Sequence, residues 1–261
     1  MTGSRPTVTV VPFAAVIVCL TLAACSPTAA GVTAAPRTSA SASLGSAPVI
    51  YAAIGASETV GVGTADHLRQ AWPQLFFNSA LPQSAIFYNF GVPGATTAEA
   101  IDLQLPDAVK VHPTLVTIWL NVNDLLAGVP SDTYEAELRT LVGAIHAAGT
   151  RQILIANTPY LDQLPAYLAC ITPGSSTLRC AVSTPVPDAT HLDAVVDAYN
   201  AATARVASQE GAVLVDLHAQ GEVPQTHPDW LASDGFHPNA QGAAAIAAAF
   251  KVAFVQASPR R

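Results

Sequence analysis

Short apolar runs alternate along this chain with longer stretches in which apolar residues recur every three or four positions. The runs are rich in Val, Ile and aromatic residues, and they lie at Val49–Ile54, Ala85–Phe90, Leu115–Leu120, Gln152–Ala156 and Ala212–Val215. Continuous apolar runs of this length are typical of strands that are buried on both faces, as in a parallel sheet.

The longer stretches carry the pattern of amphipathic helices. They lie at Ala65–Ser79, Thr97–Val109, Asp132–Ala148 and Asp188–Gln209, and a last one at Asn239–Gln256 follows the fifth apolar run. The alternation predicts an α/β fold, a three-layer α/β/α sandwich around a five-stranded, mainly parallel sheet of the flavodoxin-like kind. In such folds the chemistry lies beyond the carboxyl ends of the strands.

The first 25 residues have the pattern of an export signal. Arg5 precedes an apolar stretch, Val8 to Ala24, which ends in Leu22-Ala23-Ala24-Cys25. A positive residue, a short apolar run and small residues indicate a secretory signal peptide. Its end resembles a bacterial lipobox, which makes Cys25 the candidate lipidation site and implies a membrane anchor. Ordinary signal cleavage beside an incidental cysteine is the alternative.

Residues 26–47 contain no acidic residue and consist mostly of Ala, Ser, Thr, Gly and Pro. Such a composition cannot bury a core and predicts a flexible linker. All acidic residues lie after Ser57, so we expect the folded domain to occupy residues 48–256.

Composition narrows the class of protein. The 261 residues include 18 acidic and 11 basic ones, for a formal charge of −7, and half of the chain is hydrophobic. That is too apolar for a disordered chain. The acidic balance also argues against a nucleic-acid partner, because no basic stripe is available for phosphates.

Cys170 and Cys180 form an even pair within a Pro- and Gly-containing segment. In the oxidising compartment that an export signal implies, these two cysteines are expected to form a disulfide. Two buried free thiols are the alternative. A zinc site fits less well, because the ten-residue spacing has no nearby pair of histidines.

Two of the predicted strand ends carry residues that suit acyl transfer. Ser57 lies on the turn Gly55-Ala56-Ser57 after the first strand, where a serine can be an exposed nucleophile. Gly94 lies after the second strand and before a helix start, where a backbone N–H can point at an anion. Each pattern alone is also common in plain connections.

Asn123 follows the third strand, and its side-chain amide suits a developing oxyanion. The alternative is an Asx turn in which Asp124 caps the next segment. Near the C-terminus, Asp234 lies three residues before His237 and can orient the imidazole, which leaves the other ring nitrogen free to take a proton from a serine. A lone Asp-x-x-His is more often a surface turn.

Together, these residues occur in the order Ser, Gly, Asn, Asp-x-x-His. The set resembles the SGNH hydrolase family, also called GDSL-type esterases, over roughly residues 49–250. The resemblance implies Ser57 as nucleophile, His237 as base and Asp234 as the group that orients the base. It also implies an oxyanion hole made by the N–H groups of Ser57 and Gly94 and the amide of Asn123.

The chain departs from the family pattern at two positions. The first block usually reads Gly-Asp-Ser, and here Ala56 replaces the aspartate. That aspartate is not one of the catalytic groups, so activity is expected to survive. The third block usually begins with Gly, and Asn121 stands in its place. A side chain there is expected to narrow the acyl pocket or to add a polar contact.

Two further features lie close in sequence to the candidate residues or follow a predicted strand end. His227 is an alternative base, but it has no aspartate three residues before it, and a solvated loop histidine is expected. The segment from Thr158 to Asp188 follows the fourth strand and is about thirty residues long, well beyond the usual 2–6 residues of such connections. We expect a disulfide-pinned wall or lid beside Ser57 that contacts the acyl group, with a packing flap as the alternative.

The resemblance implies a serine esterase that hydrolyses carboxylic esters through an acyl-serine intermediate. The signal peptide predicts that it is exported, no spacing of His, Asp and Glu suggests a metal site, and no cofactor is expected. Its substrate would be a small-molecule, lipid or glycan ester, with acyl length and leaving group left open, as is the oligomeric state. A non-catalytic envelope-binding lipoprotein on the same fold and an acyltransferase are the alternatives.

Overall fold

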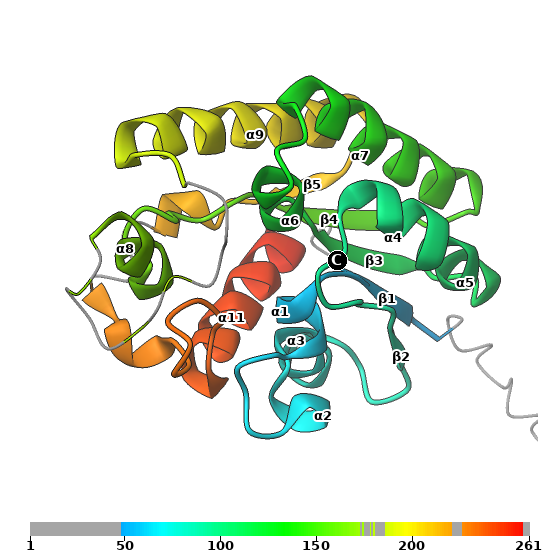
Figure 1. Ribbon diagram of the computed structural model, residues 1–261. Coiled ribbons are helices and arrows are strands. Elements are labelled where there is room, and N and C mark those ends of the chain that lie inside the picture. The colour runs from blue at the N-terminus through cyan, green and yellow to red at the C-terminus, as the bar shows by residue number, and fades with distance from the viewer. Residues whose placement is uncertain are drawn as a thin grey trace, which may run out of the picture. The chain divides into compact units, whose positions relative to one another are not determined.

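The computed structural model describes residues 48–172, 174, 178, 180, 186–220 and 226–257. The predicted signal peptide, Cys25 and the linker lie outside the described residues. Five strands form one sheet: β1 (Ile50–Gly55), β2 (Ile86–Asn89), β3 (Leu115–Trp119), β4 (Gln152–Ala156) and β5 (Val213–Val215). All neighbours pair in parallel, in the order β2-β1-β3-β4-β5 (Figure 1). The predicted three-layer α/β/α sandwich is confirmed.

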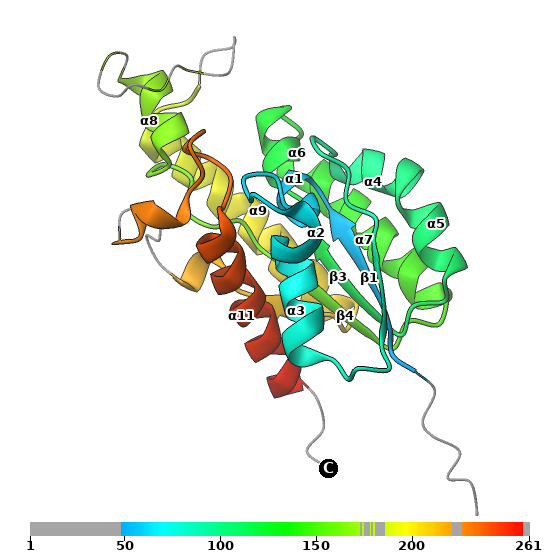
Figure 2. The ribbon, with the colours of Figure 1, turned by 90° about the horizontal axis from the view of Figure 1, so that it is seen from below.

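Helices cover both faces of the sheet (Figure 2). One layer contains α4 (Thr97–Leu103), α5 (Leu105–Lys110), α7 (Ser131–Ala147) and α9 (Ala189–Gln209), and the other contains α3 (Trp72–Ala80) and α11 (Ala240–Ala257). The shorter elements are α1 (Ser57–Val60), α2 (His67–Gln70), α6 (Val122–Leu126), α8 (Pro165–Ile171) and the 3-10 turns η1 (His218–Gln220) and η2 (Pro228–Trp230).

The strands divide their side chains between two cores, because successive residues of a strand point to opposite faces. In β1, Ala52 and Ile54 pack toward α7 and α9, while Tyr51 and Ala53 pack toward α3 and α11. The second core is aromatic: Trp72 stacks on Phe250 with ring centroids 4.1 Å apart. Both rings are fully buried, and burial of such a side chain stabilises the fold by roughly 1.5–3 kcal/mol.

Two predicted helices are each interrupted by a proline. The stretch expected at Ala65–Ser79 forms α2 and α3, with Pro73 in the first turn of α3, and the stretch at Thr97–Val109 forms α4 and α5, with Pro106 in the first turn of α5. Proline has no N–H for the carbonyl four residues earlier, so a continuous helix would lose a hydrogen bond there.

The two edge strands correct the expectation that every strand is buried on both faces. In β2 only Phe87 is even half-buried, and Ile86, Tyr88 and Asn89 are more exposed. β5 is also only partly buried. Each edge strand has one strand neighbour instead of two, so less of its surface is covered.

By length and composition alone, α11 is apolar enough to cross a membrane, although only about a fifth of it is buried. Its inner face holds Phe250 and Ala247 in the core against α3 and the sheet. Lys251 is its single charged residue. The helix therefore serves as a core helix on one side and leaves an unusually apolar second side.

Candidate active site

Ser57 occupies the first position of α1, two residues after β1 ends. The turn requires glycine at position 55, because a Cβ there would lie 2.1 Å from the Thr59 Oγ1 atom and 2.8 Å from the carbonyl oxygen of Trp119. The close approach lets the chain reverse from strand into helix without a side chain between them. Ser57 is thereby presented at the carboxyl end of the central strands.

Gln104, at the junction of α4 and α5, fixes this turn from the side. Its Oε1 atom accepts from the Gly55 N–H and its Nε2 atom donates to the Gly55 carbonyl, both at 3.0 Å. The side chain is only 1% exposed. Sequence reasoning missed this residue, because a glutamine within an amphipathic helix gives no sign of its partner 49 positions away.

Three side chains form a hydrogen-bonded chain across 180 sequence positions. The His237 Nε2 atom lies 3.0 Å from the Ser57 Oγ atom, and the His237 Nδ1 atom lies 2.6 Å from an Asp234 oxygen. Asp234 also accepts from the backbone N–H groups of Phe236 and His237, which closes the turn that carries the imidazole. This is the arrangement in which an imidazole can remove the serine proton.

Asp234 is suited to stay ionised. Its partial burial raises the pKa, but the hydrogen bonds from the His237 side chain and from the N–H groups of Phe236 and His237 outweigh burial and hold the pKa below its usual value. A carboxylate acceptor favours the tautomer with hydrogen on Nδ1. That tautomer leaves Nε2 as the acceptor that faces Ser57.

Glu58 places a second carboxylate beside Ser57. The Ser57 hydroxyl lies within hydrogen-bond distance of the Glu58 Oε2 atom, at 3.2 Å, as well as of His237. A charged residue at a helix start is normally a solvated group, whereas Glu58 lies within reach of the Ser57 hydroxyl. The serine proton therefore has two acceptors in this site.

Gly94 lies in a tight turn in which the Ala95 N–H donates to the Val92 carbonyl. Its φ of 81° is in the left-handed region, which glycine adopts without strain and which suits the third position of a turn that begins Val92-Pro93. Among the described residues, neither the Gly94 N–H nor the Ser57 N–H has a hydrogen-bond partner. Both donors are thus available to a bound group.

Asn123, in α6, is tied to the Gly94 turn. One amide hydrogen of its Nδ2 atom is donated to the Ala95 carbonyl at 3.1 Å, which leaves the second hydrogen available. Asn123 also lines a small pocket together with Ala56, Glu58 and Trp119. The structure therefore brings together the segments that carry Ser57, Gly94 and Asn123.

The alternative expected for this block, in which Asp124 caps the next segment, is not seen: α7 has Pro130 at its N-cap and no side-chain cap. Asp124 is fully buried and accepts from the backbone N–H of Thr97 at 2.9 and 3.1 Å and from the Thr97 hydroxyl at 3.2 Å. Burial raises the pKa of Asp124 to about 6, against the lowering effect of these hydrogen bonds. Asp124 joins the start of α4, which follows the Gly94 turn, to the segment that carries Asn123.

Asn121 has a backbone conformation that favours glycine, with a φ of 143°. Its side chain is 1% exposed, and its Nδ2 atom makes a long contact of 3.4 Å with the Ala156 carbonyl. Of the two outcomes expected for a side chain here, the polar contact is present. Asn121 also lines the small pocket beside Asn123.

A cavity of about 880 Å³ is lined by Glu58 and Phe236, the sequence neighbours of Ser57 and His237, although neither Ser57 nor His237 is among its described lining residues. Glu58, Trp119 and Phe236 line its end near the candidate site, and Leu161 and Leu164 line it from the segment after β4. This volume lies within the range of sites for small organic ligands. The mainly apolar lining suits a hydrophobic substrate group.

His227 is a partly exposed loop residue, as expected, but it also lines the cavity and stacks on Trp230, with ring centroids 3.8 Å apart and planes at 5°. Trp119, expected in the core, packs there with 7% exposure and also reaches the cavity.

In the described part of the chain, no three His, Cys, Asp or Glu side chains lie close enough together to hold a metal ion.

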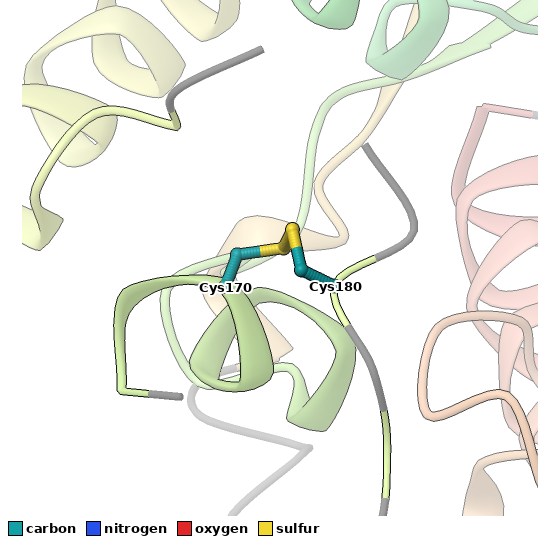
Figure 3. Close-up of a disulfide and its surroundings, with 2 residues drawn as sticks. All are labelled: Cys170 and Cys180. Carbon is teal, nitrogen blue, oxygen red and sulfur yellow. A yellow bond between two sulfur atoms is a disulfide. The ribbon is translucent and has the colours of Figure 1, made fainter. Parts of the chain in front are cut away.

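Cys170 and Cys180 form the predicted disulfide, which joins α8 to the chain that follows it (Figure 3). The segment is anchored to the candidate site at the other end of α8, where the Ala166 N–H donates to the Gly235 carbonyl at 3.1 Å. Its apolar residues Leu161 and Leu164 form a third small core with partners that include Phe236. The segment thus supports the loop that carries Asp234 and His237.

Comparisons with known proteins agree with this geometry. The sequence model of the GDSL-like lipase/acylhydrolase family matches residues 53–245. Among solved structures, TesA has a TM-score of 0.58 at 19% identity over 78% of this chain and 97% of its own. A lipase/acylhydrolase from Enterococcus faecalis has a TM-score of 0.58 at 20% identity over 82% of this chain and 99% of its own.

A catalytic mutant of Axe2, an acetylxylan esterase from Geobacillus stearothermophilus, has a TM-score of 0.55 at 20% identity over 80% of this chain and 93% of its own. At these identities the likeness establishes the fold. The comparison with curated protein sequences gives no match. Since the family's sequence model covers most of the described domain, the chain belongs to the GDSL-like lipase/acylhydrolase family, which consists of serine ester hydrolases.

Proposed function

We propose that this protein hydrolyses carboxylic esters by two-step acyl transfer through Ser57. His237 takes the serine proton as Ser57 attacks the ester carbonyl, and it returns that proton to the departing alcohol. Water then attacks the acyl-serine with the same assistance. The observation that carries this proposal is the unbroken hydrogen-bonded chain from Asp234 through His237 to Ser57.

The tetrahedral oxyanion would be held by the N–H groups of Ser57 and Gly94 and by the second amide hydrogen of Asn123. The two backbone donors have no partner among the described residues, and the Asn123 amide is already oriented by the Ala95 carbonyl. Loss of one such donor typically costs about 2.7–4 kcal/mol of transition-state stabilisation. Asn123→Ala is therefore expected to lower kcat by about 10²–10³-fold.

Water can reach the candidate site, which supports hydrolysis over acyl transfer to another acceptor. The side chain of Asp234 is 46% exposed and that of His237 is 18% exposed. A transferase needs to keep water from its acyl intermediate. A purely binding role is disfavoured, because a chain without catalytic use has no need to keep all three groups aligned.

The test of the nucleophile is covalent labelling by a fluorophosphonate together with turnover of p-nitrophenyl butyrate. Ser57→Ala should lose both while its circular dichroism and melting temperature stay unchanged. Ser84→Ala, on an exposed turn, is the matched control and should keep both. Undiminished labelling of Ser57→Ala would refute the assignment.

We further propose that the protein is exported and anchored to a membrane through Cys25. The Cys170–Cys180 disulfide supports an oxidising compartment. The native protein should partition with membranes and into detergent, and Cys25→Ser should release it or block its maturation. Wild-type protein that is wholly soluble and has a free N-terminal amine would contradict the anchor.

A further inference from the structure

We infer that the part of the cavity that runs along α11 binds the acyl chain of the ester, so that the enzyme prefers long, unbranched acyl groups. This inference rests on the proposed function and names its substrate class. We call this part of the cavity the α11 groove; its α11 wall is formed by Gly242, Ala245, Ile246, Ala249, Val252 and Ala253.

The groove is continuous with the candidate active site. One cavity is lined at one end by Glu58, the neighbour of Ser57, and by Phe236, the neighbour of His237. At the other end it is lined by Ala253 and Gln256, near the last turn of α11. This cavity also shares Glu58, Trp119 and Val122 with the small pocket that Asn123 lines, so a group bound to Ser57 can extend from that pocket into the groove.

The helix provides the space for a chain by using small residues on this side. Gly242, Ala245, Ala249 and Ala253 recur every three or four positions, which places them on one face of the helix. Gly242 is small for a different reason: a Cβ there would lie 2.5 Å from the Trp230 carbonyl oxygen, so glycine lets the chain at Trp230 pack closely on the helix, and the space for an acyl chain comes from the alanines. Leu214 and Leu217, from β5 and the chain after it, line the same cavity.

The chemistry of the lining disfavours an anionic occupant. The described lining residues include the carboxylates of Glu58 and Asp216 but no lysine or arginine to bind a phosphate or a carboxylate. Val252 is 55% exposed although it lines the groove. Cover of such a side chain by an apolar chain is favourable, because it removes apolar surface from water.

The length of the groove fits a long acyl chain. From Gly242 to Gln256 the helix rises about 21 Å, at 1.5 Å per residue. An extended hydrocarbon chain advances roughly 1.3 Å per carbon, given C–C bonds of about 1.52 Å. The groove therefore matches about sixteen carbons, with Ala249 about eight carbons and Ala253 about twelve to thirteen carbons beyond Gly242.

The acyl half of the ester is the better occupant than the alcohol half. The acyl group remains attached to Ser57 through both steps, whereas the alcohol must leave after the first. Contacts along the groove then stabilise the transition states of acylation and of deacylation alike. The alcohol half remains as a distinct outcome of the experiment.

The experiment places obstacles at two depths and measures kcat/KM for p-nitrophenyl esters from butyryl to palmitoyl in a fixed mixed-micelle system. The wild type should improve with chain length beyond ten carbons. Ala249→Trp should lose that gain beyond about eight carbons, and Ala253→Trp only beyond about twelve. Ala244→Trp, on the exposed side of the same helix and outside the cavity lining, should keep the wild-type profile.

The readout is the ratio of palmitoyl to butyryl kcat/KM, which should fall at least tenfold in Ala249→Trp. Partial unfolding lowers both rates together and leaves the ratio unchanged. A wild type that prefers acetyl or butyryl esters, or obstacles that leave the ratio unaltered, would overturn the inference. The inference would also be overturned if the two tryptophan variants limited the length of the alcohol in a series of alkyl acetates, because the groove would then bind the alcohol half of the ester. Failure of the proposed function is seen separately, as turnover that survives Ser57→Ala.

Discussion

The Gln104 side chain makes two hydrogen bonds of 3.0 Å with the backbone of Gly55: it accepts from the Gly55 N–H and donates to the Gly55 carbonyl. The two residues lie 49 positions apart, and Gly55 precedes Ser57 by two. The end of β1 is therefore fixed by a buried side chain from the helix layer. The position of Ser57 depends on this pair as well as on the local turn.

Gln104→Leu should both destabilise the protein and slow catalysis. It leaves the Gly55 N–H without its partner in a buried site, which costs about 1–3 kcal/mol. Because the turn that carries Ser57 loosens, kcat should fall more than KM rises. Urea unfolding and steady-state kinetics measure the two effects. Gln74→Leu, which removes only an exposed contact with Asn78, is the control; an unchanged kcat in Gln104→Leu would contradict the positioning role.

Asn121 provides a test of backbone strain. A non-glycine residue at φ 143° is held there at a cost of order 1–3 kcal/mol. Asn121→Gly should relieve this strain and raise the free energy of unfolding by about 1 kcal/mol, after the larger chain entropy of glycine is allowed for. Asn121→Ala keeps the strain and loses the polar contact, so it should destabilise. Calorimetry measures the thermal stability of both variants. If Asn121→Ala were more stable than the wild type, backbone strain would not explain the effect of Asn121→Gly.

The sequence was sufficient to predict the parts of the molecule that follow local rules. Apolar runs gave the five strands, and the residues that follow them placed Ser57, Gly94 and Asn123 after the carboxyl ends of strands. The prolines at 73 and 106 divide two stretches that were expected to be single helices, although proline interrupts a helix for a reason that applies to any sequence. These features depend on spacing within a few residues of one another.

The parts that could not be predicted depend on partners far apart in the chain. Gln104 and Asp124 look like ordinary helix residues until the fold brings Gly55 and Thr97 to them. The exposure of β2 depends on which strand lies at the edge, and a run of apolar residues does not report that order. The α11 groove likewise needs the helix to be placed against β5.

Asp124 should make the stability of the protein fall as pH rises through mild acid. Its folded pKa of about 6 lies above the ordinary 3.8, so between these values the folded state holds a proton that the unfolded chain has released. The contribution of Asp124 to the free energy of unfolding therefore decreases from about pH 4 to pH 6 and is constant above. Asp124→Asn removes this dependence.

The measurement is urea unfolding of the wild type and of Asp124→Asn from about pH 4 to pH 7.5. The wild type should lose about 2–3 kcal/mol relative to the variant across this range, since one pKa unit corresponds to about 1.4 kcal/mol. Asp102→Asn, at an exposed position of α4, should run parallel to the wild type. If the free energies of unfolding of Asp124→Asn and of the wild type changed with pH in parallel, burial of the Asp124 carboxyl would not raise its pKa as expected.

The disulfide should contribute to stability more than to substrate choice. Neither Cys170 nor Cys180 is among the described residues that line the cavity, whereas Leu164 is. The double variant Cys170→Ser, Cys180→Ser should lower the free energy of unfolding by roughly 3 kcal/mol on the chain-entropy estimate and leave the ester-length profile within about twofold. Leu164→Ala should alter that profile. If loss of the disulfide shifts the chain-length preference as strongly as Leu164→Ala does, the disulfide itself holds the segment after β4 in place against the substrate.

Glu58 should give the site a preference for positively charged esters over neutral ones of the same shape. Its carboxylate lies within hydrogen-bond distance of the Ser57 hydroxyl and lines the cavity, where no lysine or arginine is present among the described lining residues. A cation about 4 Å from a carboxylate gains about 1 kcal/mol in water and about 4 kcal/mol at the effective dielectric near a protein surface. Acetylcholine and 3,3-dimethylbutyl acetate differ only by nitrogen in place of carbon, so the ratio of their kcat/KM values isolates the charge.

Glu58→Gln should lower that ratio by about fivefold or more, which is the change that 1 kcal/mol produces. Asp107→Asn, which removes an exposed carboxylate paired with Lys110, is the control and should leave the ratio unchanged. An unaltered ratio in Glu58→Gln would mean that the carboxylate is screened by solvent and takes no part in selecting substrates.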